Sequence, residues 1–185
     1  MRARTTTAAL LAVAALGVGA CGDDSGGGGQ VVASSPVPDP YVTDTTAPAG
    51  PSIEKLVIGK DLEKKPAIAR PSGDPPKKLY SRDIVTGKGK AAKEGDQITV
   101  NYVGVSYSTG TEFDASWTGG KPATFGLTKG GLIEGWIKGI PGMKEGGRRL
   151  LVIPPDLGYG DQQNGTIAPN ETLVFVIDLQ KAAAS

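Results

Sequence analysis

The residues of this sequence that are best suited to do chemistry are aromatic, and most of them lie beside glycines or turn-forming residues. Six share this setting: Tyr102, Phe113, Trp117, Phe125, Trp136 and Tyr159. Aromatic side chains bury a large apolar area, and tyrosine and tryptophan also carry a polar group. Aromatic residues gathered at loops and turns indicate an apolar cleft that binds a hydrophobic ligand.

Composition excludes the common catalytic groups. The 185 residues include no histidine, which excludes Ser-His-Asp and Cys-His catalysis and zinc sites built on imidazole. A single cysteine excludes an internal disulfide and a thiolate metal cluster. Lysine and arginine together number 20 against 19 acidic residues, so no strong positive field favours nucleic acid. We therefore expect no metal, no organic cofactor and no nucleic-acid partner.

Two other patterns are better explained as turns than as sites. Asp156 and Asp161 flank Tyr159 and could suggest paired carboxylates for glycoside cleavage, but no sugar-binding platform accompanies them. Pro155-Asp156 is typical of a turn. The Gly-Gly pairs at 119–120, 130–131 and 146–147 match no phosphate-binding motif.

Alternating apolar and polar residues predict the strands that must position these aromatic side chains. Such alternation predicts strands over residues 96–105, 148–153 and 173–179, with weaker candidates at 79–86 and 123–127. Helical spacing occurs in one segment, whose apolar stripe is Leu132, Ile133, Trp136, Ile137 and Ile140. This stripe predicts a helix of about two turns, which is too short to be stable alone and so must lie across the sheet. The predicted fold class is α+β with an antiparallel sheet.

The first 52 residues predict a targeting signal and a tether. Residues 1–20 carry two arginines before a short apolar run, as in a secretory signal peptide. Val18-Gly19-Ala20-Cys21 resembles the bacterial lipobox, which implies that Cys21 is lipidated and becomes the first residue of the mature chain. The alternative is a plain signal peptide with an incidental thiol at Cys21. Residues 21–52, rich in glycine and then in proline, are interpreted as a flexible tether.

Residues 53–76 are predicted to form an extended lead-in that packs in part on the folded domain. A short apolar cluster at residues 53–58 favours that packing, whereas the four prolines between residues 66 and 76 forbid a long helix. The folded domain itself is predicted to span residues 77–185.

Six blocks, in order and at matching spacing, resemble the FKBP-type peptidyl-prolyl cis-trans isomerase domain. They are Tyr102-Val-Gly-Val, Gly110-Thr-Glu-Phe-Asp114, Leu132-Ile-Glu-Gly-Trp136, Gly142-Met-Lys-Glu-Gly-Gly-Arg-Arg149, Ile153-Pro-Pro-Asp-Leu-Gly-Tyr-Gly160 and Glu171-Thr-Leu-Val-Phe175. The resemblance covers residues 78–181. It implies an antiparallel half-barrel sheet wrapped around one short α-helix, and an enzyme that isomerises Xaa-Pro bonds.

The resemblance also implies a substrate pocket. The catalytic set that it implies is Tyr102, Phe113, Asp114, Tyr159 and Phe175. The substrate-binding set is Leu132, Ile133, Trp136 and Ile167. Trp136 would form the pocket floor, and Tyr159 would offer its hydroxyl to a ligand carbonyl. Phe125 matches a neighbouring position and is expected to be core rather than a ligand contact.

Three positions depart from the family pattern. Ala123 stands where many members have an aromatic residue, and Ala168 stands where they have a proline. Gly119 or a neighbour replaces an arginine that often pairs with the pocket aspartate. We therefore expect Asp114 to be unpaired and the pocket rim to be altered. We expect these changes to affect the catalytic rate and the macrolide affinity more than the fold.

A dry aromatic pocket suits a reaction that needs no acid, base or nucleophile. Rotation about an Xaa-Pro bond must break amide resonance, against a barrier of about 18–20 kcal/mol. The cis and trans forms differ by only about 0.5–1 kcal/mol, so the reaction is slow but nearly balanced. An apolar pocket favours the twisted amide, because that state has lost its resonance dipole.

These features predict a monomeric isomerase that acts on proline-containing unfolded or secreted chains. Its expected location is the outer face of the cell membrane, through a lipid on Cys21, or else the medium. Macrolide inhibitors are candidate ligands. The alternative function is a non-catalytic, peptide-binding or chaperone-like lipoprotein on the same fold.

Overall fold

The computed structural model describes residues 50–184. Its strands are β1 (Tyr80–Val85), β2 (Gln97–Ser106), β3 (Glu112–Ala115), β4 (Ala123–Gly126), β5 (Gly147–Ile153) and β6 (Leu173–Ala183). Its helices are α1 (Glu134–Gly139) and the 3-10 turns η1 (Ile53–Lys55), η2 (Ser116–Gly119) and η3 (Pro155–Leu157). Within this part of the chain, no helix is long and apolar enough to cross a membrane. The predicted signal and Cys21 lie outside the described residues.

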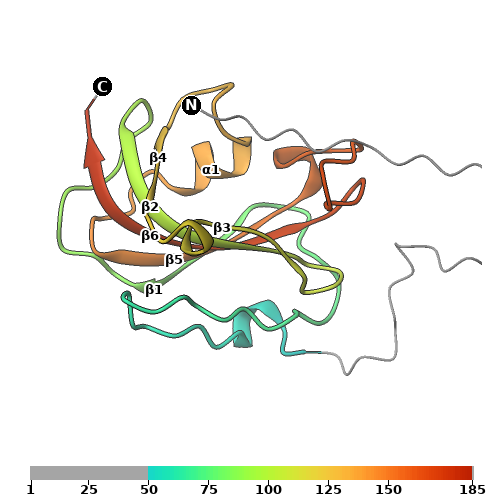
Figure 1. The fold of residues 1–185 in the computed structure, drawn as a ribbon. Helices are drawn as coiled ribbons and strands as arrows, with labels where there is room; N and C mark the ends of the chain where they lie inside the picture. The colour runs from blue at the N-terminus through green and yellow to red at the C-terminus, as the bar shows by residue number, and fades with distance from the viewer. Residues whose placement is uncertain (1–49, 185) are drawn as a thin grey trace, which may run out of the picture. The chain divides into compact units, whose positions relative to one another are not determined.

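All strand pairs are antiparallel, and the sheet runs in the order β1-β5-β6-β2-β3 (Figure 1). β2 pairs with β6 along its whole length, and a register shift falls between Thr99 and Val100. The opposite edge of β2 pairs with β4 over residues 97–100 and with β3 over residues 103–105. One long strand therefore holds two short ones, and β3 and β4 both reach the site described below.

The predicted α+β class is confirmed, and the predicted strands are all present. Three details differ. The helix begins at Glu134, so Leu132 and Ile133 precede it although they continue its apolar stripe. β6 extends to residue 183, where Ala182 is still buried. β3, which has only four residues, was not predicted.

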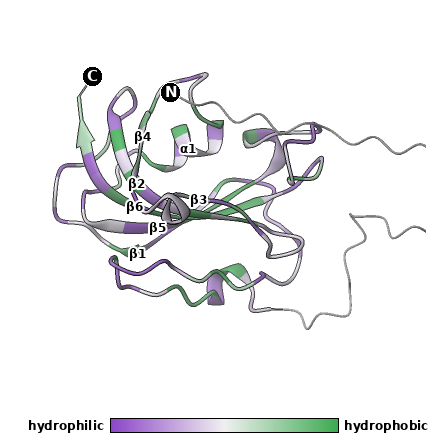
Figure 2. Ribbon diagram, viewed as in Figure 1, coloured by the Kyte–Doolittle hydropathy of each residue, from purple (hydrophilic) through white to green (hydrophobic). Residues whose placement is uncertain are grey.

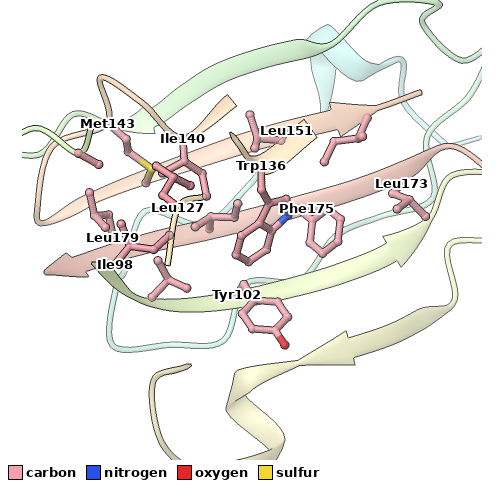
Figure 3. Packing of buried hydrophobic residues seen from close by; sticks show 14 of the residues in the cluster. Ile98, Tyr102, Leu127, Trp136, Ile140, Met143, Leu151, Leu173, Phe175 and Leu179 are labelled. Carbon is pink, nitrogen blue, oxygen red and sulfur yellow. The ribbon is translucent and has the colours of Figure 1, made fainter. Parts of the chain in front are cut away.

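The inner face of the sheet packs against α1 (Figure 3). This hydrophobic cluster takes Ile98 and Val100 from β2, Leu151 from β5, and Ile140 just past α1. Two helical glycines allow close contact. A Cβ at Gly139 would meet the Leu151 side chain at 2.8 Å, and one at Gly135 would overlap Ile153. The backbone of α1 therefore lies directly on β5.

The outer face of the sheet is covered by residues 50–78, which we call the strap (Figure 1, cyan). Three strap side chains, Ile53, Leu56 and Ile58, are buried against this face. The buried sheet residues in this second cluster are Val103, Val105, Ala115, Leu150, Val152, Val174 and Val176. Figure 2 shows hydrophobic and hydrophilic residues interspersed along the strap. The predicted lead-in thus covers an apolar surface that would otherwise face water.

Side chains from the sheet satisfy the carbonyl groups of the strap. Arg82 on β1 donates to the carbonyls of Glu54, at 3.1 Å, and Leu56, at 2.7 Å. The hydroxyl of Tyr107 lies 3.2, 3.4 and 3.3 Å from the carbonyl oxygens of residues 72, 73 and 74. The strap has no ladder partners, so these donors supply the hydrogen bonds that buried carbonyls require.

A buried ion pair between Arg148 and Asp178 also holds the strap, at residues 59 and 64. Arg148 donates through Nε and Nη2 to the two carboxylate oxygens of Asp178, at 2.5 and 2.6 Å. It also donates to the carbonyls of Gly59, at 2.5 Å, and Lys64, at 3.1 Å. Burial raises the pKa of Asp178, and the hydrogen bonds and charge of Arg148 oppose that shift. The arginine therefore neutralises a buried acid and holds the strap at the same time.

Candidate active site

A cavity of about 670 Å³ opens between the inner face of the sheet, α1 and the loop at residues 158–167. Its lining includes all nine predicted pocket residues: Tyr102, Phe113, Asp114, Leu132, Ile133, Trp136, Tyr159, Ile167 and Phe175. It also includes Phe125, Glu134, Gly130, Gly131, Gly158 and residues 164–166. This volume falls within the usual range of small-ligand sites.

Three aromatic rings contact Trp136, and a fourth, Phe113, contacts one of these three. Trp136 stands nearly perpendicular to Tyr102 and Phe175, with ring centres 5.3 Å away in both cases, and to Phe125 at 5.7 Å. Phe113 stands edge-on to Phe175 at 5.5 Å. Figure 3 shows the Trp136 ring beside the rings of Tyr102, which lies on β2, and Phe175, which lies on β6. Edge-to-face contacts of this kind are favourable and give each ring a defined orientation.

Gly104 makes room for two of these rings. It lies in β2, opposite Asp114 on one side and Phe175 on the other. A Cβ at this position would come within 2.7 Å of both the Phe113 and the Phe175 rings. The sequence pattern contained this glycine but did not reveal its role, because the crowding comes from two other strands.

Asp114 has a hydrogen-bond partner that the sequence did not indicate. The hydroxyl of Tyr102 donates to its Oδ2 at 2.6 Å. β2 and β3 are paired, and their register brings these side chains together. Burial, followed by the hydrogen bond to Asp114 and its charge, raises the pKa of Tyr102, so the phenol keeps its proton. Within residues 50–184 no lysine or arginine lies within ion-pair distance of Asp114.

Tyr159 and Ile167 come from the loops that follow β5. Tyr159 is half-buried, and its hydroxyl has no hydrogen-bond partner among the described residues, which leaves it available to a ligand. Burial, and secondarily the charge of Asp114, raises its pKa. Ile167 is buried, and its backbone exchanges hydrogen bonds with Asn164, at 2.9 and 3.1 Å, which closes the loop at the cavity edge.

Two further aromatic residues differ in position. Phe125 on β4 packs against the core and also lines the cavity. Trp117 in η2 packs against the outer cluster instead of the cavity. The chain turns sharply after β3, which sends Trp117 to the opposite face from Phe113.

Few polar side chains line the cavity. Trp136 is 3% exposed, and its indole N–H has no hydrogen-bond partner within the described part of the chain. Among the same residues, no group of three histidine, cysteine or acidic side chains could hold a metal ion. The arrangement can enclose an apolar ring and offer it a few polar contacts, and it contains no nucleophile paired with a base.

Residues 88–180 match the family model described as FKBP-type peptidyl-prolyl cis-trans isomerase. This chain belongs to that family. All nine predicted pocket residues fall inside the matched segment, whereas the strap precedes it. The predicted FKBP-like fold and the predicted enzyme class, peptidyl-prolyl cis-trans isomerase, are both confirmed.

The isomerase is similar to several curated relatives. It is 52% identical to an FK506-binding protein of Streptomyces anulatus over 118 residues, which cover 63% of this chain and 95% of that protein. It is 49% identical to a probable FK506-binding protein of Corynebacterium glutamicum over 119 residues, covering 64% and 99% of the two chains. It is 45% identical over 101 residues to the isomerase FkpA of Escherichia coli K12, covering 55% of this chain and 36% of FkpA.

Two solved structures share the fold of the isomerase. The crystal structure of FkpA from Escherichia coli superposes with a TM-score of 0.53 and 42% identity, over 57% of this chain and 48% of that chain. The crystal structure of AtFKBP13 gives a TM-score of 0.54 and 39% identity, over 59% of this chain and 96% of that chain.

Proposed function

We propose that this isomerase accelerates rotation about Xaa-Pro bonds in unfolded or secreted polypeptides by holding the proline ring on Trp136. The observation that carries the proposal is the aromatic cavity itself, in which three rings meet the Trp136 indole edge-on. Such a cavity removes water from the amide. The twisted amide has lost its resonance dipole and is therefore favoured there relative to the planar forms.

Each polar group then has a defined task. Tyr102 holds Asp114 through the 2.6 Å hydrogen bond, so that one carboxylate oxygen is fixed and the other faces no partner among the described residues. Tyr159 offers its hydroxyl to the carbonyl before the proline. Leu132 and Ile133 present backbone groups at the cavity edge, just before α1. None of these steps transfers a proton, in keeping with the absence of histidine.

The same cavity is proposed to admit macrolide inhibitors. Several relatives are named FK506-binding proteins, and the cavity volume of about 670 Å³ suits a large apolar ligand. Ala123 and Gly119, where the family pattern has larger side chains, do not line the cavity, so the aromatic lining would hold the macrolide.

The proposed location is the outer face of the cell membrane, with the domain tethered through a lipid on Cys21. The signal-like residues 1–20 and the lipobox-like sequence before Cys21 support this proposal. Metabolic labelling with palmitate tests it directly. The wild-type chain should carry the label and sediment with membranes, and Cys21→Ala should abolish both; unlabelled wild-type chain in the medium would favour the secreted alternative.

Refolding of a protein whose slow phase is set by a cis proline distinguishes catalysis from simple binding. An isomerase at substoichiometric concentration should speed the slow phase, which otherwise takes tens to hundreds of seconds. A non-catalytic binding module would slow refolding or leave its rate unchanged, and would act only at stoichiometric amounts. The second result would favour the peptide-binding alternative.

A further inference from the structure

Phe113 and Asp114 both line the cavity because the pairing of β3 with β2 contains a bulge. Gly104 of β2 lies opposite Asp114. Val105, the next residue of β2, lies opposite Glu112, so Phe113 is the extra residue. In a regular strand neighbouring side chains point to opposite faces, whereas these two neighbours line one cavity. The placement of the bulge therefore decides how this ring and this carboxylate meet a substrate.

The strap contacts the chain just before the bulge at three points. Nζ of Lys65 lies 2.8 Å from Oε1 of Glu112. A Cβ at Gly110 would lie 2.7 Å from Cβ of Arg70 and 3.2 Å from its Cα, so the turn between β2 and β3 rests directly on the strap. The hydroxyl of Tyr107, at the start of that turn, faces the carbonyls of residues 72–74.

These contacts can act on the cavity only through the bulge, because no residue of the strap lines the cavity. Tyr107 is 5% exposed, so its hydroxyl would lack a partner if the strap moved away, which is costly for a buried polar group. The side chains of Lys65 and Glu112 are 42% and 38% exposed, so solvent screens this pair and its contribution is smaller.

We propose that Lys65, Arg70 and Tyr107 are positioning residues for the isomerase reaction. They hold the bulge that presents Phe113 and Asp114 to the substrate. This rests on the proposed function, in which the aromatic cavity holds the proline ring. A displacement of about 1 Å at a reacting site can reduce a rate about a hundredfold, so such placement matters. The strap precedes the segment that matches the family model, yet it sets the rate of the reaction.

Tyr107→Phe tests the buried contact, because it removes the hydroxyl and keeps the ring. The full mature protein is assayed with a Leu-Pro peptide at a temperature where circular dichroism shows the variant to be folded. We expect kcat to fall by about three- to tenfold and KM to stay within about twofold, because the rest of the cavity still binds the proline ring.

Tyr80→Phe is the matched control. Tyr80 packs against the same outer cluster, but it lies on β1 and not on the β2–β3 turn. Its loss of a hydroxyl should leave kcat unchanged. A hydroxyl that only stabilises the fold would lower the melting temperature without changing kcat of the folded protein. Wild-type kcat in Tyr107→Phe would therefore overturn the proposal, as would equal losses in both variants.

Exchanging the charges of Lys65 and Glu112 tests the exposed contact. Lys65→Glu and Glu112→Lys each place like charges beside one another, whereas the double variant restores an ion pair in the reverse order. At low salt each single variant should lose about two- to fivefold in kcat, as for one exposed pair. The double variant should recover most of that loss. Losses that simply add in the double variant would contradict a positioning role for this pair.

The phenylalanines allow the bulge to be observed without measuring activity. The chain has three, Phe113, Phe125 and Phe175, and all of them line the cavity. Labelling with fluorophenylalanine gives each ring its own fluorine NMR resonance. In Lys65→Glu the Phe113 resonance should shift or broaden, and in the double variant it should return. The Phe125 resonance, from β4, should stay in place in both. An unchanged Phe113 resonance in Lys65→Glu would count against the proposal.

The proposal and the function beneath it fail in different ways. If the wild-type protein accelerates no peptide, the proposed function is wrong and the positioning role falls with it. If the wild-type protein is active and Tyr107→Phe turns over equally fast, the isomerase function stands and the positioning role is wrong.

Discussion

Replacing Gly104 with alanine should damage the cavity while leaving the fold in place. The added Cβ would lie 2.7 Å from both the Phe113 and Phe175 rings, whereas ordinary van der Waals contact begins at 3.4 Å. Each ring must therefore withdraw by about 0.7 Å, or β2 must move by a similar amount. Overpacking of this kind costs about 1–3 kcal/mol.

The expected effect on activity is larger than the effect on stability. A displacement of about 1 Å at a catalytic site can reduce the rate about a hundredfold, so a shift near 0.7 Å should reduce kcat/KM by about tenfold or more. The melting temperature should fall by roughly 3–15 °C for the expected loss of stability. Peptide relaxation kinetics and thermal unfolding, measured on the same preparation, give both values.

Gly119→Ala is the control for this experiment. Its Cβ would meet nothing within 4 Å, and its φ lies outside the left-handed region. Its stability should change by less than about 0.5 kcal/mol and its activity should not change. Full activity in Gly104→Ala, or equal damage in both variants, would refute the idea that this glycine shapes the aromatic wall.

Three further predictions concern the strap and the tyrosine. Arg148→Met should destabilise the domain by about 3–5 kcal/mol, because it leaves Asp178 buried without its partner. In this variant burial raises the pKa of Asp178 with no arginine to oppose it, so the folded variant takes up a proton as pH falls and the loss should shrink toward low pH. Urea denaturation measures this loss, and one that does not depend on pH would contradict the interpretation. A chain that begins at residue 78 should melt well below one that begins at residue 50, because each of three buried strap side chains contributes about 1.5–3 kcal/mol; equal melting temperatures would show that the strap is dispensable. Because the pKa of Tyr102 is raised, isomerase activity should stay level between about pH 6 and about pH 9, and a fall centred near neutral pH would show that another group controls activity.

The sequence predicted secondary structure best where an apolar pattern allowed one interpretation. Apolar residues over 173–179 and 148–153 identified the central strands, and both strands are buried on both faces, by α1 on one side and by the strap on the other. It was less informative around Leu132 and Ile133. Their apolar spacing continues that of the helix, but they precede it and line the cavity. Periodicity reports burial and does not separate a core contact from a cavity wall.

Features that depend on strand register could not be read from the sequence. The partner of Asp114 is Tyr102, and only the pairing of β2 with β3 brings them within 2.6 Å. The need for glycine at position 104 also arises from neighbouring strands. The packing of the strap was foreseen in outline from its apolar cluster, but the role of Arg148 was not, because its contacts join residues more than 80 positions apart.

Cis-to-trans relaxation of a Leu-Pro peptide tests the central claim most directly. The wild-type protein, Phe175→Ala and Asp114→Ala should be compared at equal concentration, with folding checked by circular dichroism. Phe175→Ala removes a ring that touches the Trp136 floor, and Asp114→Ala removes the carboxylate held by Tyr102. The account predicts clear acceleration by the wild-type protein and a loss of at least about tenfold in each folded variant, which corresponds to about 1.4 kcal/mol of transition-state stabilisation. Full activity in both variants would contradict the assignment of catalysis to this cavity.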